Sequence, residues 1–546
     1  MSKVAYYLQE HLNGEVITTA DARKYFSTDA SIFSVAPTLV VYPKNENDVR
    51  KTARFTWQLA ERGRVIPITA RGSGTNTSGA AIGSGIILAF PAHMHRILEL
   101  DEKSGTVTVE PGSSYGKLQQ TLQTHGRFLL PYPASLEYST IGGAVANNSG
   151  GEKSIKYGST RDFVKGLRVV LSNGEVIETR RLGKREFSHK LGLSSFEGEI
   201  YRAVDALLDE AKGSLDKITT LGVTKNTAGY ALGDIKRRDG SFDLTPLIVG
   251  SQGTLGLITE IVLDSAPVAL ESALFVGHFD NFQNVQAAIT ELRSLSDLPS
   301  AIEMVDSNLL ETVSKVNPNL LKDVITGPYP RAILFVEFDN SSDRAQKKIT
   351  KKAKKIFDHY AAKYQVETEP ALQEQQWRIR HSVSTISTID NNGSKAVPVI
   401  DDGVVPVEHF AEYVDGIYKI FANSQLQVAL WGHAGDGNLH LLPVLNLSQV
   451  GDRQKAYKLM EEYNNLVISL GGSTSGEYND GRLRAPYLNK LYGDEMYGYF
   501  QKAKQIFDPY GLLNPGVKIS VSLDDIKPLM RQDYSVDSLF AHLPRS

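Results

Sequence analysis

The chain has 546 residues, of which 41% are hydrophobic and 22% charged, and its formal net charge is −3. This length exceeds what a single hydrophobic core supports, so two to four domains are expected. The balanced charge argues against nucleic acid or an anionic membrane as a partner, and the absence of cysteine excludes disulfides, thiol catalysis and a cysteine-ligated iron–sulfur cluster in this chain.

The start of the chain, residues 1–34, is expected to form a helical segment ahead of the first domain. It has no apolar signal-like core, and no apolar run in the chain approaches the roughly 18–20 residues that a membrane span needs. We therefore expect a cytoplasmic protein without an integral membrane segment.

A β-α-β unit follows. TLVVYP at 38–43 predicts a strand, residues 46–63 predict a helix that ends at Gly63, and VIPITA at 65–70 predicts a second strand. The glycine-rich RGSGTNTSGAAIGSG comes next. A dinucleotide-binding fold would begin a helix at such glycines, but the following SGIILAF predicts a strand. The loop is therefore expected to approach a phosphate through its backbone, without a helix.

Short strands and turns dominate residues 100 to 266, including a hairpin signal in VVLSNGEVI around Asn173-Gly174. From 267 to 420, helical patterns such as FQNVQAAITELRSLS and AQKKITKKAKKIFDHYAAKYQ alternate with strands such as RAILFVEF. This alternation predicts a second, α+β domain. The lysine-rich QKKITKKAKK is interpreted as the solvated face of an amphipathic helix, with a basic binding patch as the alternative.

The segment WGHAGDGNLH at 431–440 places two histidines around an Asp436-Gly437 turn. Pairing counted outward from that turn sets His433 directly opposite His440, with their Cβ atoms roughly 4.5–5.5 Å apart. Glu477, in SGEYNDGRLRAPYL, offers a third donor. Two imidazoles and a carboxylate with an open position suit a divalent transition metal such as zinc, manganese or iron. A hydrogen-bonded or half-exposed histidine pair is the alternative.

Three small-residue stretches allow close approach to a planar, phosphate-bearing ligand, although each alone is typical of tight turns. They are Arg71–Thr75, PASLEYSTIGGAVANNSGG at 133–151 and VGSQGTLGLITE at 249–260. Together with KYGSTRDFVKGLRVVLSNGEVI and KNTAGYAL, their order resembles the FAD-binding oxidoreductases of the vanillyl-alcohol-oxidase type, which have a PCMH-type FAD domain. Within them, the chain resembles the D-lactate, glycolate and D-2-hydroxyglutarate dehydrogenase branch, from about residue 35 to 519.

The resemblance implies an α+β fold in which two subdomains form an FAD-binding domain at 35–266. A substrate or cap domain that carries the metal hairpin would span 267–475, a segment at 476–519 would close on the flavin, and a polar tail would occupy 520–546. The residues implied in cofactor binding are Arg71, Gly72, Ser73, Gly74, Thr75, Ser135, Ser139, Thr140, Gly142, Gly143, Asn147, Gly151, Ile258 and Asn514.

The flavin is expected to be non-covalent, because Thr75 stands where some relatives carry a histidine that tethers FAD. Oxidation of a 2-hydroxy acid to a 2-oxo acid sends a hydride to the flavin while the hydroxyl proton is removed. In the resembling dehydrogenases a metal stabilises the developing alkoxide. The ligands implied here are His433, His440 and Glu477.

Arg380 matches the family's substrate arginine, whose fork of N–H donors suits a carboxylate, with a surface salt bridge as the alternative. Ser384, one helical turn beyond Arg380, and Lys395 are further candidates. Relatives commonly read Gly-Glu-His where this chain has Tyr478 after Glu477. A tyrosine with a pKa near 10 is a poor base unless its phenolate is stabilised, so His381 is an alternative proton acceptor.

These features predict an FAD-dependent dehydrogenase that oxidises a small, D-lactate-like 2-hydroxy acid with the help of a divalent metal. Electrons would pass to a separate acceptor, which is a protein, a quinone or oxygen. The alternatives are a flavin-binding subunit without independent activity, an FAD oxidase of a non-standard alcohol, and a metal-dependent hydrolase. Homo-oligomerisation, the acid, the metal and the proton acceptor stay open at this point.

Overall fold

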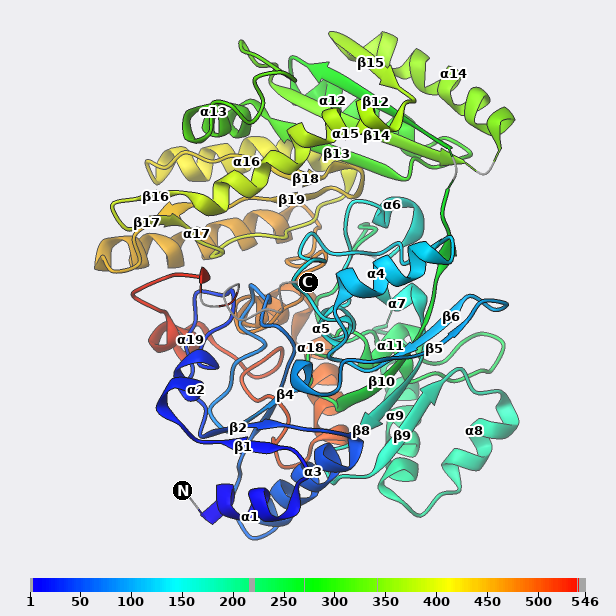
Figure 1. Cartoon of the computed structure of the whole chain (residues 1–546), viewed down its shortest axis with the longest axis vertical. Helices are drawn as coiled ribbons and strands as arrows, with labels where there is room; N and C mark the ends of the chain where they lie inside the picture. The colour runs from blue at the N-terminus through cyan, green and yellow to red at the C-terminus, as the bar shows by residue number, and fades with distance from the viewer. Residues whose placement is uncertain (1–2, 216–220, 270, 341, 538, 540–546) are drawn as a thin grey trace.

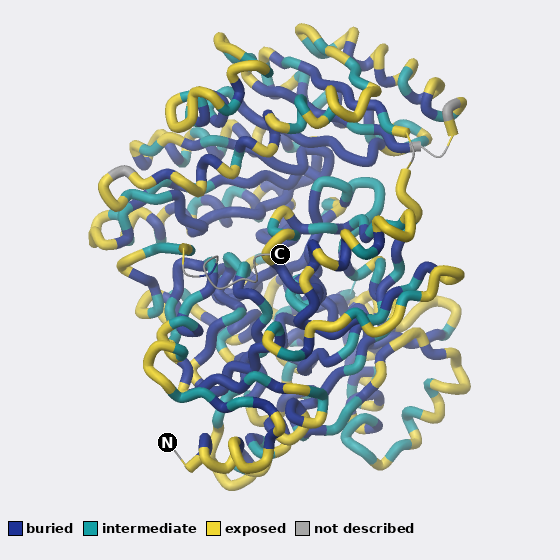
Figure 2. The backbone as a smooth tube through the Cα atoms, viewed as in Figure 1, coloured by how far each residue is buried: buried dark blue, intermediate teal, exposed yellow. Residues whose placement is uncertain are grey.

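The computed structural model describes residues 3–215, 221–269, 271–340, 342–537 and 539. Its N-terminal half contains two main sheets and a small two-stranded one, and forms the lower part of Figure 1, where the chain is coloured blue to teal. The green and yellow segments form the upper part around a six-stranded sheet. Dark blue buried backbone runs continuously through both parts in Figure 2. Mixed helix and strand layers of this kind confirm the predicted α+β class.

The first sheet has the strand order β1-β2-β4-β3, with β2, β4 and β3 parallel and β1 antiparallel. The predicted β-α-β unit is confirmed, and its helix α3 begins where the Asn45 side chain accepts a hydrogen bond from the amide of Asp48. The glycine-rich loop runs directly from β3 into β4, as predicted. The elements are α1 (Lys3–His11), β1 (Glu15–Ile17), α2 (Ala20–Tyr25), β2 (Leu39–Tyr42), α3 (Glu46–Ala60), β3 (Ile68–Arg71) and β4 (Ile86–Ala89).

The expectation of an all-helical start is wrong, because β1 interrupts it. Val16 in β1 pairs with Val41 in β2 and is buried in the core of the first sheet. The short strand therefore covers the edge of β2 by backbone hydrogen bonding. A helix could not form these bonds, because its backbone groups bond to one another.

The second sheet is antiparallel, with the order β5-β6-β10-β8-β9. The predicted hairpin at Asn173-Gly174 is confirmed, since Val170 pairs with Val176 and Gly174 adopts a φ of 85°. The elements of this region are β5 (Ile97–Asp101), β6 (Thr106–Val109), α4 (Tyr115–Thr124), β7 (Arg127–Phe128), α5 (Ile141–Asn147), α6 (Ser154–Tyr157), α7 (Thr160–Phe163), β8 (Val164–Val170), β9 (Val176–Arg180), α8 (Lys184–Leu191), α9 (Phe196–Ala211), α11 (Thr245–Ile248), β10 (Leu257–Asp264) and β11 (Ala266–Pro267).

The upper sheet has the order β15-β12-β14-β13-β18-β19, and its neighbouring strands are antiparallel. Helices α12 and α14 pack on one face through residues such as Phe275, and α13 and α15 pack on the other through residues such as Leu274. The elements are β12 (Glu271–Phe279), α12 (Phe282–Arg293), β13 (Ala301–Asp306), α13 (Ser307–Val316), β14 (Ala332–Asn340), α14 (Asp343–Tyr360), β15 (Lys363–Glu367), α15 (Pro370–His381), β16 (Asp390–Asn391), β17 (Ser394–Ala396), α16 (Phe410–Asn423), β18 (Trp431–His433), β19 (Asn438–His440), β20 (Val444–Leu445) and α17 (Val450–Ser469).

The lysine-rich helix α14 buries Ile349 and Phe357 and exposes its lysines, which confirms the amphipathic interpretation. The predicted helical pattern extended to Gln365, and this part is wrong. The helix ends at Tyr360, and Gln365 pairs with Val276 in strand β15.

The last part of the chain returns to the lower half, where α18 (Leu488–Phe507) packs beside α9 in the core of the second sheet. Figure 1 shows α18 in orange-red among the teal elements, and the short α19 (Leu523–Ile526) follows it. Within the described residues, no helix combines the length and apolar character that a bilayer crossing requires.

Candidate active site

A cavity of about 210 Å³ lies between the two sheets of the N-terminal half. Its walls come from the loop after β3, the loop that leads into α5, α5 itself and the start of β10. All the predicted cofactor residues except two line it: Arg71, Gly72, Ser73, Gly74, Thr75, Ser135, Ser139, Thr140, Gly142, Gly143, Asn147 and Ile258.

The backbone itself forms much of the cavity wall, because the glycines there have no side chain to cover it. Thr140 caps the N-terminus of helix α5, and its hydroxyl accepts a hydrogen bond of 3.2 Å from the amide of Gly143. A Cβ on Gly142 would lie 2.6 Å from the carbonyl oxygen of Pro111, so no larger residue fits there. Gly74 adopts a φ of 83°, which only glycine takes up without strain.

Three hydroxyl groups in the cavity wall fit a polar ligand such as FAD. The hydroxyls of Ser73, Thr77 and Ser139 are buried and have no hydrogen-bond partner among the described residues. Buried polar atoms without a partner are costly, and a bound ligand with phosphate and hydroxyl oxygens would satisfy them. Arg71 Nη1 donates to the carbonyls of Thr28 and Ala81, whereas its Nε and Nη2 atoms are buried and have no hydrogen-bond partner among the described residues.

Gly151 and Asn514 are placed beside the cavity and are not among its lining residues. The Asn514 amide donates to the carbonyls of Ala80 and Gln252, both at 2.8 Å. Asn514 therefore ties the C-terminal segment to the cavity wall. Gly151 packs so closely on Tyr132 that a Cβ would lie 2.0 Å from its carbonyl oxygen.

The predicted register of the histidine hairpin is wrong by two residues. His433 pairs with Asn438, and His440 pairs with Trp431, because the connection is a four-residue turn with 3₁₀ geometry at Ala434–Asp436. A shift of two residues keeps every side chain on its face of the sheet, so both histidines still project from the same face.

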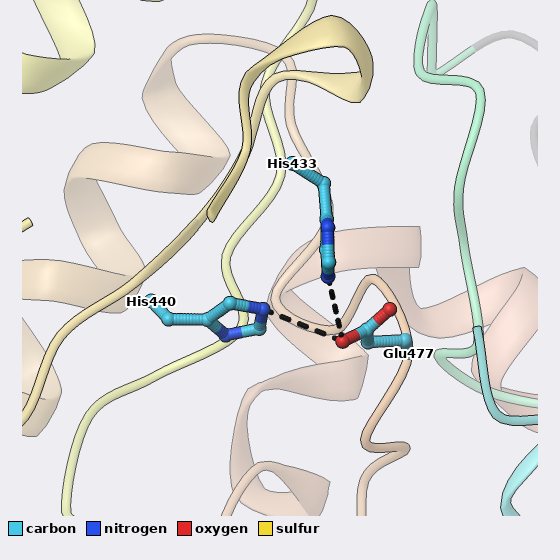
Figure 3. A group of neighbouring side chains, drawn as sticks. All are labelled: His433, His440 and Glu477. Carbon is cyan, nitrogen blue, oxygen red and sulfur yellow. Dashed lines mark hydrogen bonds and ion pairs between the residues drawn. The ribbon is translucent and has the colours of Figure 1, made fainter. Parts of the chain in front are cut away.

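The two histidines and Glu477 form a compact buried group, here called the His–Glu cluster. Figure 3 shows both imidazoles pointing at one carboxylate oxygen. The Nε2 atoms of His433 and His440 lie 3.1 and 3.3 Å from Glu477 Oε1, and the ring centroids lie 5.1 Å apart. The potential ligand atoms of the three residues lie within 4.8 Å of one another, which suits a single metal ion.

Carboxylates behind the histidines orient them for such an ion. His433 Nδ1 lies 2.7 Å from Glu303, and His440 Nδ1 lies 2.9 Å from Asp401. Histidine ligands of metals are commonly held in this way by a carboxylate on their other nitrogen. The Nε2 of His440 is buried and faces Glu477 Oε1 at 3.3 Å, so a cation bound here would replace this contact.

The charges of the cluster are set by burial and by close partners. Burial alone would lower the pKa of His440, but Asp401 and Glu477 raise it to about 10. Burial would raise the pKa of Glu477, but His433 and Lys225 hold it well below its usual value. Glu477 is therefore an anion, and a metal would have to displace a proton from the cluster.

Arg380 is buried next to the cluster. Its Nε and Nη2 atoms lie 2.9 and 2.8 Å from Glu303 Oε2, and Glu303 also holds His433. The neighbouring His381 contacts Glu152 at 3.0 Å. Burial would raise the pKa of Glu152, but His381 and Arg380 lower it to about 2, so this carboxylate is ionised.

The structure does not bring Ser384 and Lys395 to the cluster. Ser384 is exposed and donates to the carbonyl of His381, while Lys395 faces Asp390 at 3.5 Å. No described contact joins either residue to the cluster. Both lie beyond the end of α15, where the chain turns toward the surface.

Tyr478 connects the cavity to the cluster. It lines the cavity, and its ring stacks on His440 with centroids 5.0 Å apart. Burial and neighbouring carboxylates raise its pKa well above 10, so the phenol is neutral. Arg482 and Arg484 follow Tyr478 closely in the sequence and are nearby cations that could stabilise a phenolate. Their guanidiniums donate to backbone carbonyls. A neutral phenol can donate or accept a hydrogen bond but is a poor base.

Three charged residues of the site were missed by the sequence predictions: Glu303, Asp401 and Lys225. Glu303 occupies a core-facing position in the strand AIEMVD, and a charged residue in such a buried strand is a signal of a polar site. Asp401 stands in the acidic pair of VIDDGVVP, and Lys225 opens KNTAGYAL, a segment that is part of the family resemblance.

Comparison with known proteins places these features in a family. Residues 37–180 match the model of an FAD binding domain, and residues 271–517 match the C-terminal domain of FAD linked oxidases. Glycolate oxidase subunit GlcD of Bacillus subtilis is 30% identical over 90% of this chain and 92% of its own length.

D-2-hydroxyglutarate dehydrogenase of Escherichia coli is also 30% identical, over 96% of this chain, but the chain spans only 52% of that relative's length. D-lactate dehydrogenase of Anaerostipes hadrus is 26% identical over 88% of this chain and 90% of its own. In fold, the chain is similar to 4-ethylphenol oxidase from Gulosibacter chungangensis, with a TM-score of 0.67, 16% identity and coverage of 95% and 97% of the two chains.

Proposed function

Because the chain belongs to the family of FAD-linked oxidases and dehydrogenases, we propose that it is a dehydrogenase of a small D-2-hydroxy acid assisted by a divalent metal. The observation that carries the proposal is the stacking of Tyr478, a wall residue of the flavin cavity, on His440 of the His–Glu cluster. A substrate at this junction would lie between the flavin and the metal.

When bound, FAD supplies the acceptor of two electrons, and the metal supplies a Lewis acid for the substrate oxygen. His433, His440 and Glu477 would hold the metal, and Glu303 and Asp401 keep both imidazoles turned toward it. The wall hydroxyls and glycines would hold the flavin without a covalent bond, because Thr75 lacks the imidazole nitrogen through which a histidine at this position would attach to the flavin.

Arg380 is proposed to bind the substrate carboxylate. Within the described residues its buried guanidinium contacts one carboxylate oxygen, Glu303 Oε2, and it has further N–H donors on its fork. Tyr478 would hydrogen-bond the substrate as a neutral phenol. His381 is proposed to take up the proton, since it lies next to Arg380 and is more than half exposed.

The electrons are proposed to leave the flavin for a separate acceptor. This chain contains no cysteine, so it cannot hold a cysteine-ligated iron–sulfur cluster of its own. A protein, a quinone or oxygen would then reoxidise the flavin.

The test is anaerobic mixing of the FAD-loaded protein with D-lactate, glycolate and D-2-hydroxyglutarate while the flavin absorption is recorded. At least one acid should bleach the flavin band, and its L-isomer, where one exists, should not. Removal of the metal with a chelator should abolish the bleaching, and added Zn²⁺, Mn²⁺ or Fe²⁺ should restore it. Bleaching by none of a broad panel would contradict the proposal, and bleaching that survives chelation would contradict the role of the metal.

Arg380→Lys is expected to raise the KM for the acid by about 10- to 100-fold. The reason is that a hydrogen bond to a charged group contributes about 1.5–3 kcal/mol to binding. Lysine keeps the positive charge toward Glu303 but loses the fork that binds a carboxylate with two parallel bonds. Steady-state kinetics with an artificial acceptor measures the change. Arg378→Lys, on the exposed side of the same helix, is the control, and an unchanged KM in Arg380→Lys would remove Arg380 from substrate binding.

A further inference from the structure

Lys225 is a buried cation that contacts the His–Glu cluster from the side opposite the histidines. Its side chain is only 6% exposed, and its Nζ lies 2.9 Å from Glu477 Oε2. The same atom lies 3.4 Å from the carbonyl oxygen of Gly151 and 3.7 Å from Asp436 Oδ2. A buried ammonium group requires such partners, so its position is well determined.

The two oxygens of Glu477 therefore have different partners. Oε1 faces the Nε2 atoms of both histidines, whereas Oε2 faces the ammonium group of Lys225. A glutamate can bind a metal through one oxygen or through both, and the second mode uses an additional coordination position. A catalytic metal needs a position that the protein leaves open.

We propose that Lys225 is a positioning residue that restricts Glu477 to coordination through Oε1 and so keeps a position open for the substrate. This inference rests on the metal site of the proposed function. The lysine would also place a positive charge near the metal, which weakens metal binding while it preserves the open position.

The histidine hairpin itself anchors the lysine. Asp436 lies in the turn between His433 and His440, and its other oxygen, Oδ1, accepts a hydrogen bond of 2.6 Å from the hydroxyl of Thr224. One turn thus connects both imidazoles with the lysine that holds the third ligand.

The backbone of Glu477 is fixed independently of Lys225. Asp402 accepts hydrogen bonds from the amide of Glu477 at 3.0 and 3.1 Å and from the amide of Tyr478 at 2.7 Å. Loss of Lys225 would therefore free the carboxylate to rotate without releasing the segment that carries it. This separation makes the role of Lys225 testable.

The experiment compares the FAD-loaded wild type with Lys225→Met, which removes the charge and the donors, and with Lys225→Arg, which keeps both. Lys504→Met is the matched control, because Lys504 is also a mostly buried lysine with a carboxylate partner, Asp508, but lies in α18. Each metal-free protein is titrated with Co²⁺ by equilibrium dialysis, and the bound Co²⁺ is examined by EPR, in which oxidised flavin is silent.

Lys225→Met should bind Co²⁺ on the order of tenfold more tightly than the wild type, because a nearby positive charge is lost and Glu477 gains a second ligating oxygen. Its EPR spectrum should differ from that of the wild type, whereas Lys225→Arg and Lys504→Met should retain the wild-type affinity and spectrum. If Lys225→Met fails to accumulate as a folded flavoprotein, Lys225→Gln, which also lacks the charge, carries the same expectation.

A Lys225→Met protein with normal FAD content, a wild-type spectrum and unchanged or weaker Co²⁺ binding would overturn the inference and leave the proposed function intact. A wild type that binds no Co²⁺ would overturn the metal site itself and this inference with it.

Discussion

Glu477→Gln is expected to slow the reduction of bound FAD by the hydroxy acid by about a thousandfold, while FAD binding is unchanged. The amide has no charge to offer a cation, and Glu477 is the one anionic member of the His–Glu cluster. A thousandfold loss corresponds to about 4 kcal/mol of barrier, which is of the size expected when an electrostatic stabiliser of a transition state is removed.

Anaerobic stopped-flow spectroscopy at the flavin band measures this rate, and metal analysis of the purified variant should show that the metal is lost. Glu412→Gln, an equivalent substitution at an exposed position of α16, should reduce its flavin at the wild-type rate. Wild-type flavin reduction in a metal-free Glu477→Gln protein would show that the cluster has no part in the reaction.

The grouping of His433, His440 and Glu477 could be predicted even though the predicted hairpin register was wrong. The sequence predicted His433 opposite His440, and the true turn is longer, so that His433 pairs with Asn438. Since side chains alternate along a strand, an error of two residues moves the histidines along the hairpin but leaves them on the same face. An error of one residue would have put them on opposite faces.

The charged residues around the cluster could not be predicted in the same way, because they come from distant parts of the chain. Glu303 precedes His433 by 130 residues, and Lys225 precedes Glu477 by 252 residues. Glu303 reaches His433 because β13 lies next to β18 in the upper sheet, whereas Lys225 reaches Glu477 because two distant segments pack together. No local pattern encodes either arrangement.

The wall of the cavity was largely predictable because it depends on the backbone itself. Glycines that allow close approach are visible in a sequence, and Gly72, Gly74, Gly142 and Gly143 all line the cavity. The side chain of Arg71 was less predictable, since no local pattern shows that its Nη1 donates to the carbonyls of Thr28 and Ala81.

Gly143→Leu is expected to yield a colourless protein that holds less than about a tenth of the wild-type FAD. Gly143 lies in the first turn of α5 and lines the cavity, and the nearest atom that an added Cβ would meet is Thr140 Oγ1 at 3.2 Å. A leucine side chain would therefore extend into the cavity that is proposed to hold the flavin. Leucine favours a helix more than glycine does, so α5 itself should form.

The FAD content is measured from the absorption ratio of the flavin band to the protein band, before and after incubation with excess FAD. A loss of affinity of at least about 100-fold, or about 3 kcal/mol, is expected from the steric overlap. Gly498→Leu is the control, because Gly498 is also helical and an added Cβ would meet nothing within 4 Å. That variant should stay yellow, whereas a Gly143→Leu protein with full FAD content would show that the flavin binds elsewhere than this cavity.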